Sequence, residues 1–248
     1  MAITSFKRHE KKFLINEVQY AKILPVLGQY MHLDEFCQNG QEYSIYNIYY
    51  DTDDSSLIRH SLTRPYYKEK LRLRTYCIPG SLNSQVFLEL KKKIGGTVNK
   101  RRAVLNLGEA YKFLECGIYP ENPDYMNRQV LSEINFFLKH YDVKPACYIS
   151  FKRIALFGQQ DNDFRITFDH NIITRREELG LEKGCYGEEL LEPGQVLMEV
   201  KVSGGFPLWL ANYLSENQIY RIKFSKYGQE YTRGLMKRET ACCLQTAV

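Results

Sequence analysis

The sequence lacks any apolar stretch that approaches the ~18 residues of a membrane-spanning helix. It has no C-x-x-C pair, and its seven cysteines are scattered, so we expect free thiols and neither disulfides nor a zinc site. Residues 1–8 lack the pattern of a secretory signal, and a cytoplasmic protein is therefore expected. No repeat or low-complexity linker divides the chain, which favours a single domain over 1–248, with a core over 6–235 and a mobile tail over 238–248.

The charge balance is only mildly basic. The net charge is +5 with a pI near 8.7, and 44% of the residues are hydrophobic, which is typical of a globular chain. Such a balance suggests an anionic partner without requiring a nucleic acid. The five histidines show no spacing typical of a catalytic triad or a metal site.

Basic residues recur with the two-residue period of a β-strand. Lys70, Arg72 and Arg74 would share one face of a strand, with leucines on the other face. The pairs Glu89/Lys91 and Glu199/Lys201 follow the same pattern. For any one strand, a solvated outer face is the simpler explanation. Several strands with charges of mostly one sign would repel each other, however, unless they surround an anion.

The pattern of elements predicts an α+β fold. Because charged strand faces cannot point into a hydrophobic sandwich, we expect a closed antiparallel eight-stranded β-barrel with flanking helices, its charged lumen being wide enough for one small ligand. Helices are expected over about 16–31, with a kink or break at Pro25, over 108–116, over 126–141 and after Pro207. The polar, Gly-rich region 171–195 is expected to form a long excursion. The expected strands are 6–15, 43–51, 68–78, 85–94, 98–107, 147–157, 163–170 and 196–203.

Eight short motifs occur in a fixed order along the chain. They are Arg8-His9-Glu10-Lys11-Lys12-Phe13, Leu71-Arg72-Leu73-Arg74, Phe87-Leu88-Glu89-Leu90-Lys91, Val98-Asn99-Lys100-Arg101-Arg102, Tyr148 to Leu156, Phe164-Arg165-Ile166-Thr167-Phe168-Asp169, Met198-Glu199-Val200-Lys201 and Ile222-Lys223-Phe224-Ser225-Lys226-Tyr227. Together they resemble the VTC-type polyphosphate polymerase domain of the triphosphate tunnel (CYTH-like) superfamily. The resemblance covers nearly the whole chain, from about Phe6 to about Tyr231.

The resemblance implies ATP-dependent synthesis of inorganic polyphosphate inside a cationic tunnel, assisted by Mn²⁺ or Mg²⁺. Arginine and lysine suit phosphate oxygens, and carboxylates suit these metals. The implied partners are ATP and polyphosphate or pyrophosphate, with a membrane-protein partner possible. The implied residues are Lys223, Lys226, Arg72 and Arg74 for catalysis; Lys12, Lys91, Lys100, Arg153, Arg165 and Lys201 for phosphate binding; and Glu199, then Glu10, Glu89 and Asp169, for the metal.

Several placements depend on local geometry. Lys70, Arg102 and Lys201 fit the rim or solvent as well as the tunnel, and Arg101 has the parity of an outside residue. Arg153 shares parity with Phe151, so an inward Arg153 is expected to need a bulge or bend. Lys223 and Lys226 would reach the same side of one helical turn.

Three alternatives to the polymerase remain. A tripolyphosphatase or nucleoside triphosphatase of the same fold would open with E-x-E-x-K, whereas this chain has Arg8 at the first glutamate position. A non-catalytic polyphosphate-binding module would keep the cations without turnover. A nucleic-acid binder would interleave exposed aromatics with the cations, but most Tyr and Phe residues alternate away from them, so no nucleic acid is expected. The sequence leaves the oligomeric state open.

Overall fold

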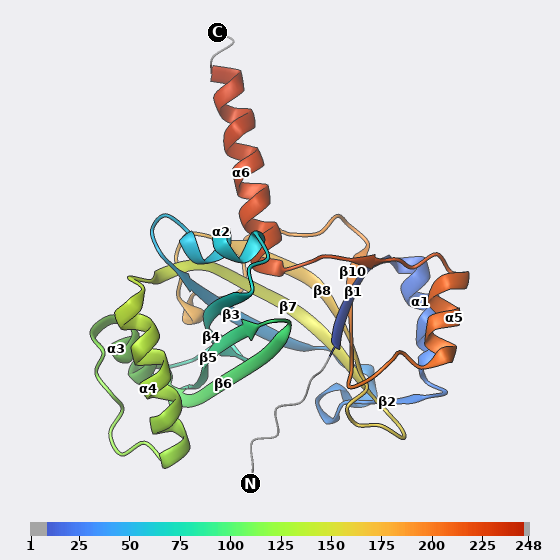
Figure 1. Ribbon diagram of the computed structural model, residues 1–248, viewed down its shortest axis with the longest axis horizontal. Helices are drawn as coiled ribbons and strands as arrows, with labels where there is room; N and C mark the ends of the chain where they lie inside the picture. Colours follow the sequence, from blue (N-terminus) through green and yellow to red (C-terminus); the bar gives the residue numbers. More distant parts are fainter. Residues whose placement is uncertain (1–8, 246–248) are drawn as a thin grey trace. The chain divides into compact units, whose positions relative to one another are not determined.

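The computed structural model describes residues 9–245. The chain divides into two compact units, which are described separately. Unit 1 comprises Met1–Ile45, Ser150–Ile172 and Leu191–Lys223, and unit 2 comprises Tyr46–Ile149, Ile173–Leu190 and Phe224–Val248. Figure 1 shows the chain coloured along its sequence.

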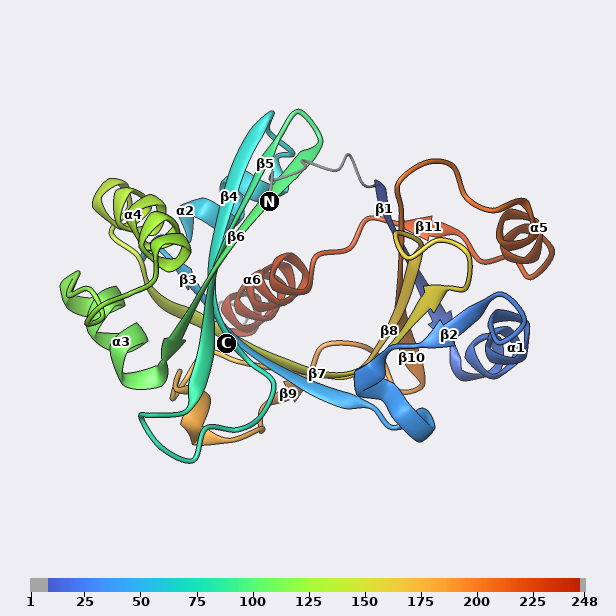
Figure 2. The same ribbon diagram turned by 90° about the horizontal axis from the view of Figure 1, so that it is seen from below.

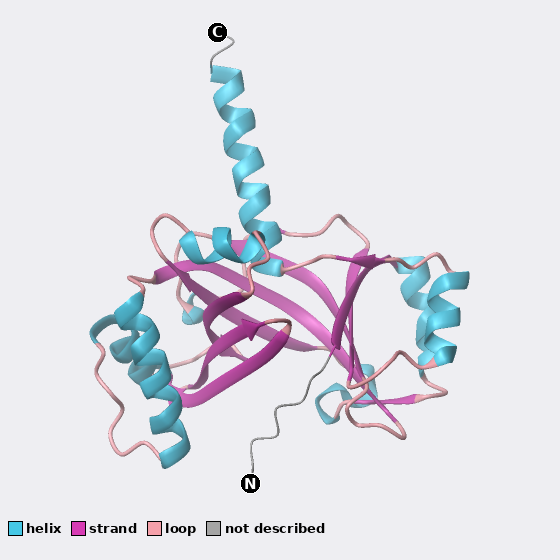
Figure 3. Cartoon of the chain, in the orientation of Figure 1, coloured by secondary structure: helices cyan, strands magenta, loops and turns pink. Residues whose placement is uncertain are grey.

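The described residues combine strands and helices, which confirms the α+β class (Figure 3). The strands are β1 His9–Asn16, β2 Met31–Leu33, β3 Tyr43–Asp51, β4 Tyr67–Thr75, β5 Gln85–Ile94, β6 Thr97–Asn106, β7 Lys144–Gly158, β8 Arg165–Arg175, β9 Glu188–Glu189, β10 Gln195–Val202 and β11 Arg221–Ile222. The helices are α1 Glu17–Leu27, α2 Ser56–Leu62, α3 Leu107–Cys116, α4 Tyr125–His140, α5 Leu208–Glu216 and α6 Lys226–Gln245, with 3₁₀ turns at Glu35–Gly40 and Leu181–Lys183.

The strands form an eleven-stranded sheet in the order β11-β1-β10-β8-β7-β3-β4-β5-β6, with β2 paired to β7 and β9 to β8. Within residues 9–245 the sheet is not closed, because β11 and β6 end this order. The closed eight-stranded barrel is therefore not confirmed. One physical reason lies at the free edge of β6, where Asn127 of α4 accepts a hydrogen bond from Val104 N (2.9 Å) and donates one to Val104 O (3.2 Å). A side chain that occupies edge groups blocks further strand pairing there.

In unit 2, β4, β5 and β6 form a regular antiparallel meander. The turn between β5 and β6 has positive φ at both central residues, Gly95 (53°) and Gly96 (92°), which suits a two-residue hairpin and favours glycine. One face of these strands is apolar, and α3 and α4 cover it in Figure 1. Burial of that face fixes the register, because a slip by one residue would exchange the two faces. Its fully buried residues include Leu71, Leu73, Val86, Leu88, Leu90 and Ala103.

In unit 1, α1 and α5 lie side by side next to β1 and β10 (Figure 2) and share their apolar cluster. The α1 helix begins with the expected cap. The Asn16 side chain accepts a hydrogen bond from Gln19 N (2.8 Å), and the Gln19 side chain accepts one from Asn16 N (3.1 Å). Pro25 lies inside the last turn of α1, and the helix ends two residues later at Leu27 instead of continuing to Met31. The helix therefore passes through Pro25, and it is shorter than expected.

The excursion after β8 is held in unit 2 by one buried arginine. The Arg175 guanidinium donates to the carbonyl oxygens of four residues, namely Glu178, Gly180, Gly184 and Tyr186. It also lies over the rings of Tyr148 (3.6 Å) and Tyr186 (4.2 Å). The ordered excursion then contacts α6, where Arg176 forms a two-bonded ion pair with Glu230 (2.7 Å each). The base of α6 is therefore fixed by side-chain contacts on a loop that has little regular structure.

Helix α6 continues to Gln245 and so includes most of the tail that was expected to be mobile. Its residues from Leu235 to Thr240 are exposed. A search of the described helices finds none with the length and hydrophobicity required to cross a membrane.

Candidate functional site

The face of β4–β6 opposite the apolar core carries mostly cations. We call this set of residues the cationic face of unit 2. The regular register places its charges in cross-strand rows, in which Lys70, Lys91 and Lys100 are neighbours and Arg72, Glu89 and Arg102 are neighbours. The cationic face consists of Lys68, Lys70, Arg72 and Arg74 on β4, Glu89, Lys91 and Lys93 on β5, and Lys100 and Arg102 on β6.

One buried carboxylate, Glu89, serves four of these cations, and only 1% of its side chain is exposed. Arg72 Nε and Lys100 Nζ each lie 2.7 Å from it, and Arg102 Nε lies 2.6 Å away. Arg74 Nε is more distant (4.0 Å) and donates to Asn47 Oδ1 (2.8 Å). A single negative charge cannot neutralise four positive charges, so the cluster keeps a net positive charge in a partly desolvated place.

The pKa values follow from this imbalance. Burial alone would raise the pKa of Glu89, but Arg72, Arg74 and Lys100 hold it well below its ordinary value of 4.5. Burial would also raise the pKa of Tyr49, whose hydroxyl accepts from Arg72 (3.2 Å), yet Arg72 and Arg74 lower it. Both shifts indicate a strongly positive local potential that favours bound anions.

A second row consists of three lysines, of which Lys100 also contacts Glu89 (2.7 Å). Lys70, Lys91 and Lys100 lie directly opposite one another on adjacent strands, an arrangement that destabilises a sheet unless an anion screens it. Lys70 donates to Ser225 Oγ (3.1 Å), whereas Lys91 makes no hydrogen bond or ion pair within the described part of the chain. The row is thus suited to an extended polyanion that crosses the strands.

Lys100 gives this face a testable pH dependence. Burial, together with Arg102 and Arg72, lowers its pKa from 10.5 to about 8 despite the opposing Glu89. Its proton is therefore lost from the folded protein near pH 8, and we expect tripolyphosphate affinity to fall several-fold between pH 7 and 9. The phosphates, with a last pKa of roughly 6, are ionised throughout this range.

The measurement is a titration of tripolyphosphate at constant ionic strength with a Lys100→Arg variant as the matched control. Arginine stays charged, so the variant should bind with nearly constant affinity across pH 7–9. Parallel pH curves for the two proteins would show that Lys100 is not the titrating group.

The K-F-S-K-Y motif brings a further cation to unit 2. Lys226 is the first residue of α6 and is only 8% exposed. Its charge lies close enough to Tyr49 to help lower the pKa of the Tyr49 hydroxyl. Ser225 Oγ accepts from Gly228 N (3.3 Å) at the helix start. Tyr227 donates to Asp51 (2.9 Å) and stacks on Tyr49 (5.1 Å between centroids). The neighbours of Lys226 in the motif therefore fix its position.

Lys223 behaves differently. It is exposed, follows β11 in an irregular segment and belongs to unit 1. Because α6 begins only at Lys226, the expectation that both lysines project from one helical turn is wrong. Its proposed catalytic role has no other support from local geometry.

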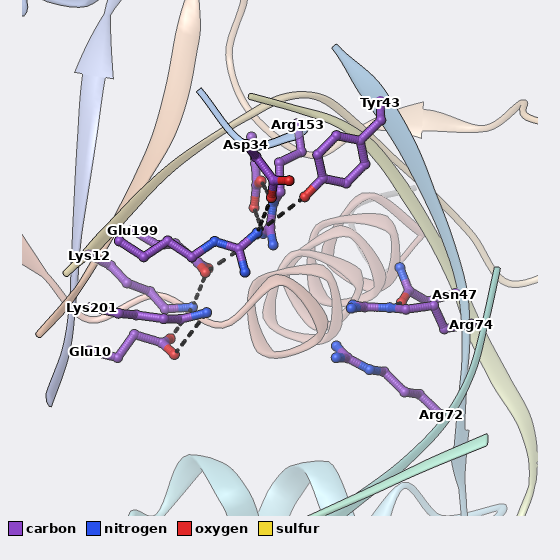
Figure 4. A network of polar contacts seen from close by, with 12 residues as sticks. Glu10, Lys12, Asp34, Tyr43, Asn47, Arg72, Arg74, Arg153, Glu199 and Lys201 are labelled. Atoms are coloured by element: carbon purple, nitrogen blue, oxygen red, sulfur yellow. Dashed lines mark hydrogen bonds and ion pairs between the residues drawn. The ribbon is translucent and has the colours of Figure 1, made fainter. Parts of the chain in front are cut away.

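In unit 1 the face of β1, β10 and β8 opposite the core is also charged, but here acids and bases alternate (Figure 4). Lys12 Nζ lies 2.7 Å from Glu199 Oε1 and 3.2 Å from Glu10 Oε1. Burial alone would lower the pKa of Lys12, and the two carboxylates raise it instead. Lys201 reaches Glu10 more loosely (4.0 Å). This cluster is close to neutral, in contrast to the cationic face of unit 2.

Two arginines lie on the same side of unit 1. Arg153 donates to both oxygens of Asp169 (2.6 and 2.8 Å) and approaches Glu199 (3.8 Å). Arg165 donates to Asp34 (3.2 Å) and to the Tyr43 hydroxyl (3.3 Å). Both guanidiniums are therefore oriented by acids, as phosphate ligands need to be.

The placement of Arg153 on the charged side does not require the bulge or bend that the sequence argument invoked. β7 is one continuous strand, and Phe151 lies on the charged side of it, where its ring is 5.1 Å from the Arg153 guanidinium. The sequence argument assumed that Phe151 belongs to the core, but it is absent from both apolar clusters. A buried aromatic ring can instead support a cation.

The acids of the two units differ in their suitability as metal ligands. Glu10 and Glu199 both approach Lys12, and no group of three or more His, Cys, Asp or Glu residues suited to a metal occurs among the described residues. Mg²⁺ and Mn²⁺ need few protein carboxylates when phosphates and water supply the other oxygens. Glu10 and Glu199 fit that requirement. Glu89 does not, because its oxygens already contact four cations, and Asp169 is engaged with Arg153.

The model of the VTC domain family matches residues 7–233. The chain belongs to the VTC domain family. Among solved structures, this VTC domain resembles a Bacillus halodurans protein provisionally named an adenylate cyclase, with 17% identity, a TM-score of 0.49, and coverage of 88% of this chain and 95% of that one. A Vibrio parahaemolyticus protein of the same provisional name gives 12% identity, a TM-score of 0.45 and coverage of 92% and 98%. A search of curated proteins gives no match.

The structure also shows site residues that the sequence argument missed or left open. Arg102 joins the Glu89 cluster, and its two-residue spacing from Lys100 was a usable signal. Arg101 points away and pairs with Glu133 (3.1 Å), as its parity predicted. Asn47 and Tyr49, which orient Arg74 and Arg72, had no such signal because they carry no charge. Arg8, which replaces the first glutamate of the hydrolase motif, lies outside the described residues.

Proposed function

We propose that this VTC domain is an ATP-dependent polyphosphate polymerase. The observation that carries the proposal is the cationic face of unit 2, where four cations share the single buried carboxylate of Glu89. A surface with this surplus of charge binds a polyanion of repeating phosphates better than a single small anion. Membership of the VTC domain family supports the same substrate class.

The proposed reaction is a phosphoryl transfer between phosphates. A terminal oxygen of polyphosphate, or of a starting phosphate or pyrophosphate, attacks the γ-phosphorus of ATP. A new P–O bond forms there, and the bond between the γ-phosphorus and the β–γ bridging oxygen breaks. ADP leaves with that electron pair, and the polyphosphate grows by one unit. Such a transfer needs positioning and charge neutralisation from the protein and no covalent intermediate.

In unit 2, Arg72, Arg74 and Lys226 are proposed to neutralise the phosphoryl group during transfer. Arg72 and Arg74 are pre-oriented by Tyr49 and Asn47, which lowers the cost of organising them in the transition state. The row with Lys91 and Lys100, which is more open, is proposed to bind the phosphates of the chain. In unit 1, Lys12, Arg153, Arg165 and Lys201 are proposed to bind phosphate oxygens.

Glu199 and Glu10 are proposed to hold Mn²⁺ or Mg²⁺, which when bound would neutralise phosphate charge and orient the reacting oxygens. Lys12 lies between the two carboxylates and pairs with both. Glu89 is not retained in this set.

The decisive experiment incubates the protein with ATP and Mn²⁺ and measures three products: polyphosphate on stained gels, ADP and free phosphate. A polymerase releases one ADP for each phosphate unit that it adds to polyphosphate, and it gives little free phosphate. A tripolyphosphatase or nucleoside triphosphatase gives free phosphate instead, and a binding module gives no turnover. Either of the last two outcomes overturns the proposal.

A Glu199→Gln variant should fold but lose metal-dependent turnover by about 10³-fold or more, since a lost metal ligand costs several kcal/mol of transition-state stabilisation. The readout is ADP release as a function of Mn²⁺ concentration, with circular dichroism to confirm folding. The matched control is Glu216→Gln on α5, where the side chain is exposed and makes no ion pair within the described residues. Equal ADP release by the two variants would remove Glu199 from the metal site.

A further inference from the structure

Two aromatic side chains lie at one end of the cationic face of unit 2. Tyr76 directly follows β4, and Phe87 lies on β5 opposite Arg74. Their rings meet edge to face with centroids 5.4 Å apart. Tyr76 is 40% exposed, so part of its ring is accessible to a ligand.

Arg102 joins this aromatic pair to the phosphate-binding cluster. Its guanidinium donates to the Tyr76 hydroxyl (3.0 Å) and to Glu89 (2.6 Å), and it lies 4.6 Å from the Phe87 ring centroid. One side chain thus contacts the aromatic pair and the acid at the centre of the cations. A ligand with phosphates on the cations would have the aromatic pair as its next neighbour.

We propose that Tyr76 and Phe87, supported by Arg102, form a stacking site for the purine base of ATP, so that this end of the cationic face holds the nucleotide. The inference rests on the proposed function in that ATP is the phosphoryl donor. After the phosphoryl transfer, ADP lies at the aromatic end of the cationic face, and polyphosphate occupies the lysine row.

ATP and inorganic polyphosphate differ in chemistry, and each is expected to prefer a different end of the cationic face. Inorganic polyphosphate has no apolar or aromatic surface, so an exposed tyrosine ring adds nothing to its binding. A purine has a π-face that stacks on aromatic rings and on guanidinium groups. The aromatic end is therefore matched to a nucleoside triphosphate, and the lysine-only row Lys70–Lys91–Lys100 to a chain of phosphates.

The test compares ATP with inorganic tripolyphosphate in three proteins: wild type, Tyr76→Leu and Tyr76→Phe. Titration calorimetry at fixed salt without metal gives the affinities. Tyr76→Leu should weaken ATP binding about tenfold and tripolyphosphate binding less than about twofold, because only ATP loses a stacked base. Tyr76→Phe keeps the ring and loses the hydroxyl contacts with Arg102 and Arg74, so it should retain wild-type discrimination between the ligands.

A second readout reports the base directly. The triphosphate of 2-aminopurine riboside is fluorescent, and its emission should be quenched on binding to wild type and to Tyr76→Phe but not to Tyr76→Leu. If Tyr76→Leu changes both ligands equally, Tyr76 acts only through Arg102 and the inference is wrong. If it changes neither ligand, the base lies elsewhere and the inference is also wrong.

These outcomes are distinct from failure of the proposed function. A protein that makes no polyphosphate but loses ATP selectivity and quenching in Tyr76→Leu has the base site without the polymerase. A protein that makes polyphosphate with unchanged ATP affinity in Tyr76→Leu is a polymerase without this base site.

Discussion

A Glu89→Gln variant should lose about 3–5 kcal/mol of unfolding free energy in the absence of polyanions, since removal of one partner leaves buried charges uncompensated. The loss is expected to be at the upper end because four cations, not one, share this carboxylate. Denaturant unfolding at low salt measures it. Addition of tripolyphosphate should restore most of the loss, because a bound polyanion replaces the missing negative charge.

The matched control is Glu133→Gln, which removes the partner of Arg101 on the opposite face of β6. That acid is more exposed than Glu89 (28% against 1%) and contacts one cation, so its loss should cost less than the loss of Glu89 and should not respond to tripolyphosphate. A small, anion-independent effect in Glu89→Gln would show that the cations are well solvated without their acid.

The sign of the pH dependence follows from the depressed pKa of Glu89. The stabilisation from this carboxylate is fully present above its ordinary value of 4.5 and is lost as the pH falls through the lower value of the folded state. The difference in stability between wild type and Glu89→Gln should therefore be constant near neutral pH and shrink in acid.

Lys226→Ala should lower turnover by at least about 10³-fold while changing polyphosphate affinity less than about threefold. The buried ammonium lies at the start of α6 near Tyr49, where it is proposed to neutralise the transferred phosphoryl group. Many other cations still bind the chain, so ground-state affinity should be retained. ADP production and tripolyphosphate titrations at two salt concentrations measure the two effects.

Lys237→Ala is the control on the same helix. Its ammonium is exposed and pairs with Glu188 (2.6 Å), so its removal should leave turnover unchanged. Lys100→Ala should show the reverse of Lys226→Ala, with weaker and salt-dependent binding. Matching small effects for Lys226→Ala and Lys237→Ala would place Lys226 outside the reaction.

Period-two alternation was sufficient to predict the charged face of β4 and β5. Lys70, Arg72 and Arg74 share a side because a strand permits no other arrangement, and the intervening leucines are fully buried. The α4 helix and the Gly117 stop of α3 were predicted as well, since amphipathic spacing and a residue with positive φ are local signals. These parts of the fold depend on neighbours in sequence.

The remaining features depend on residues far apart in the chain. Phe151 lies beside Arg153 on the charged side of β7, whereas the sequence argument assigned that ring to the core. The closed barrel was inferred from charge repulsion, but Asn127 on a distant helix occupies edge groups of β6. Short strands such as β2, β9 and β11 have too few residues to show a period.

The path of the chain through the two units has a consequence for how the protein can be divided. The chain passes between the units after residues 45, 149, 172, 190 and 223, and the first three of these passages fall inside β3, β7 and β8. Neither unit is therefore a continuous fragment that truncation could deliver intact. A protease cut within any of these three strands would damage both units at once.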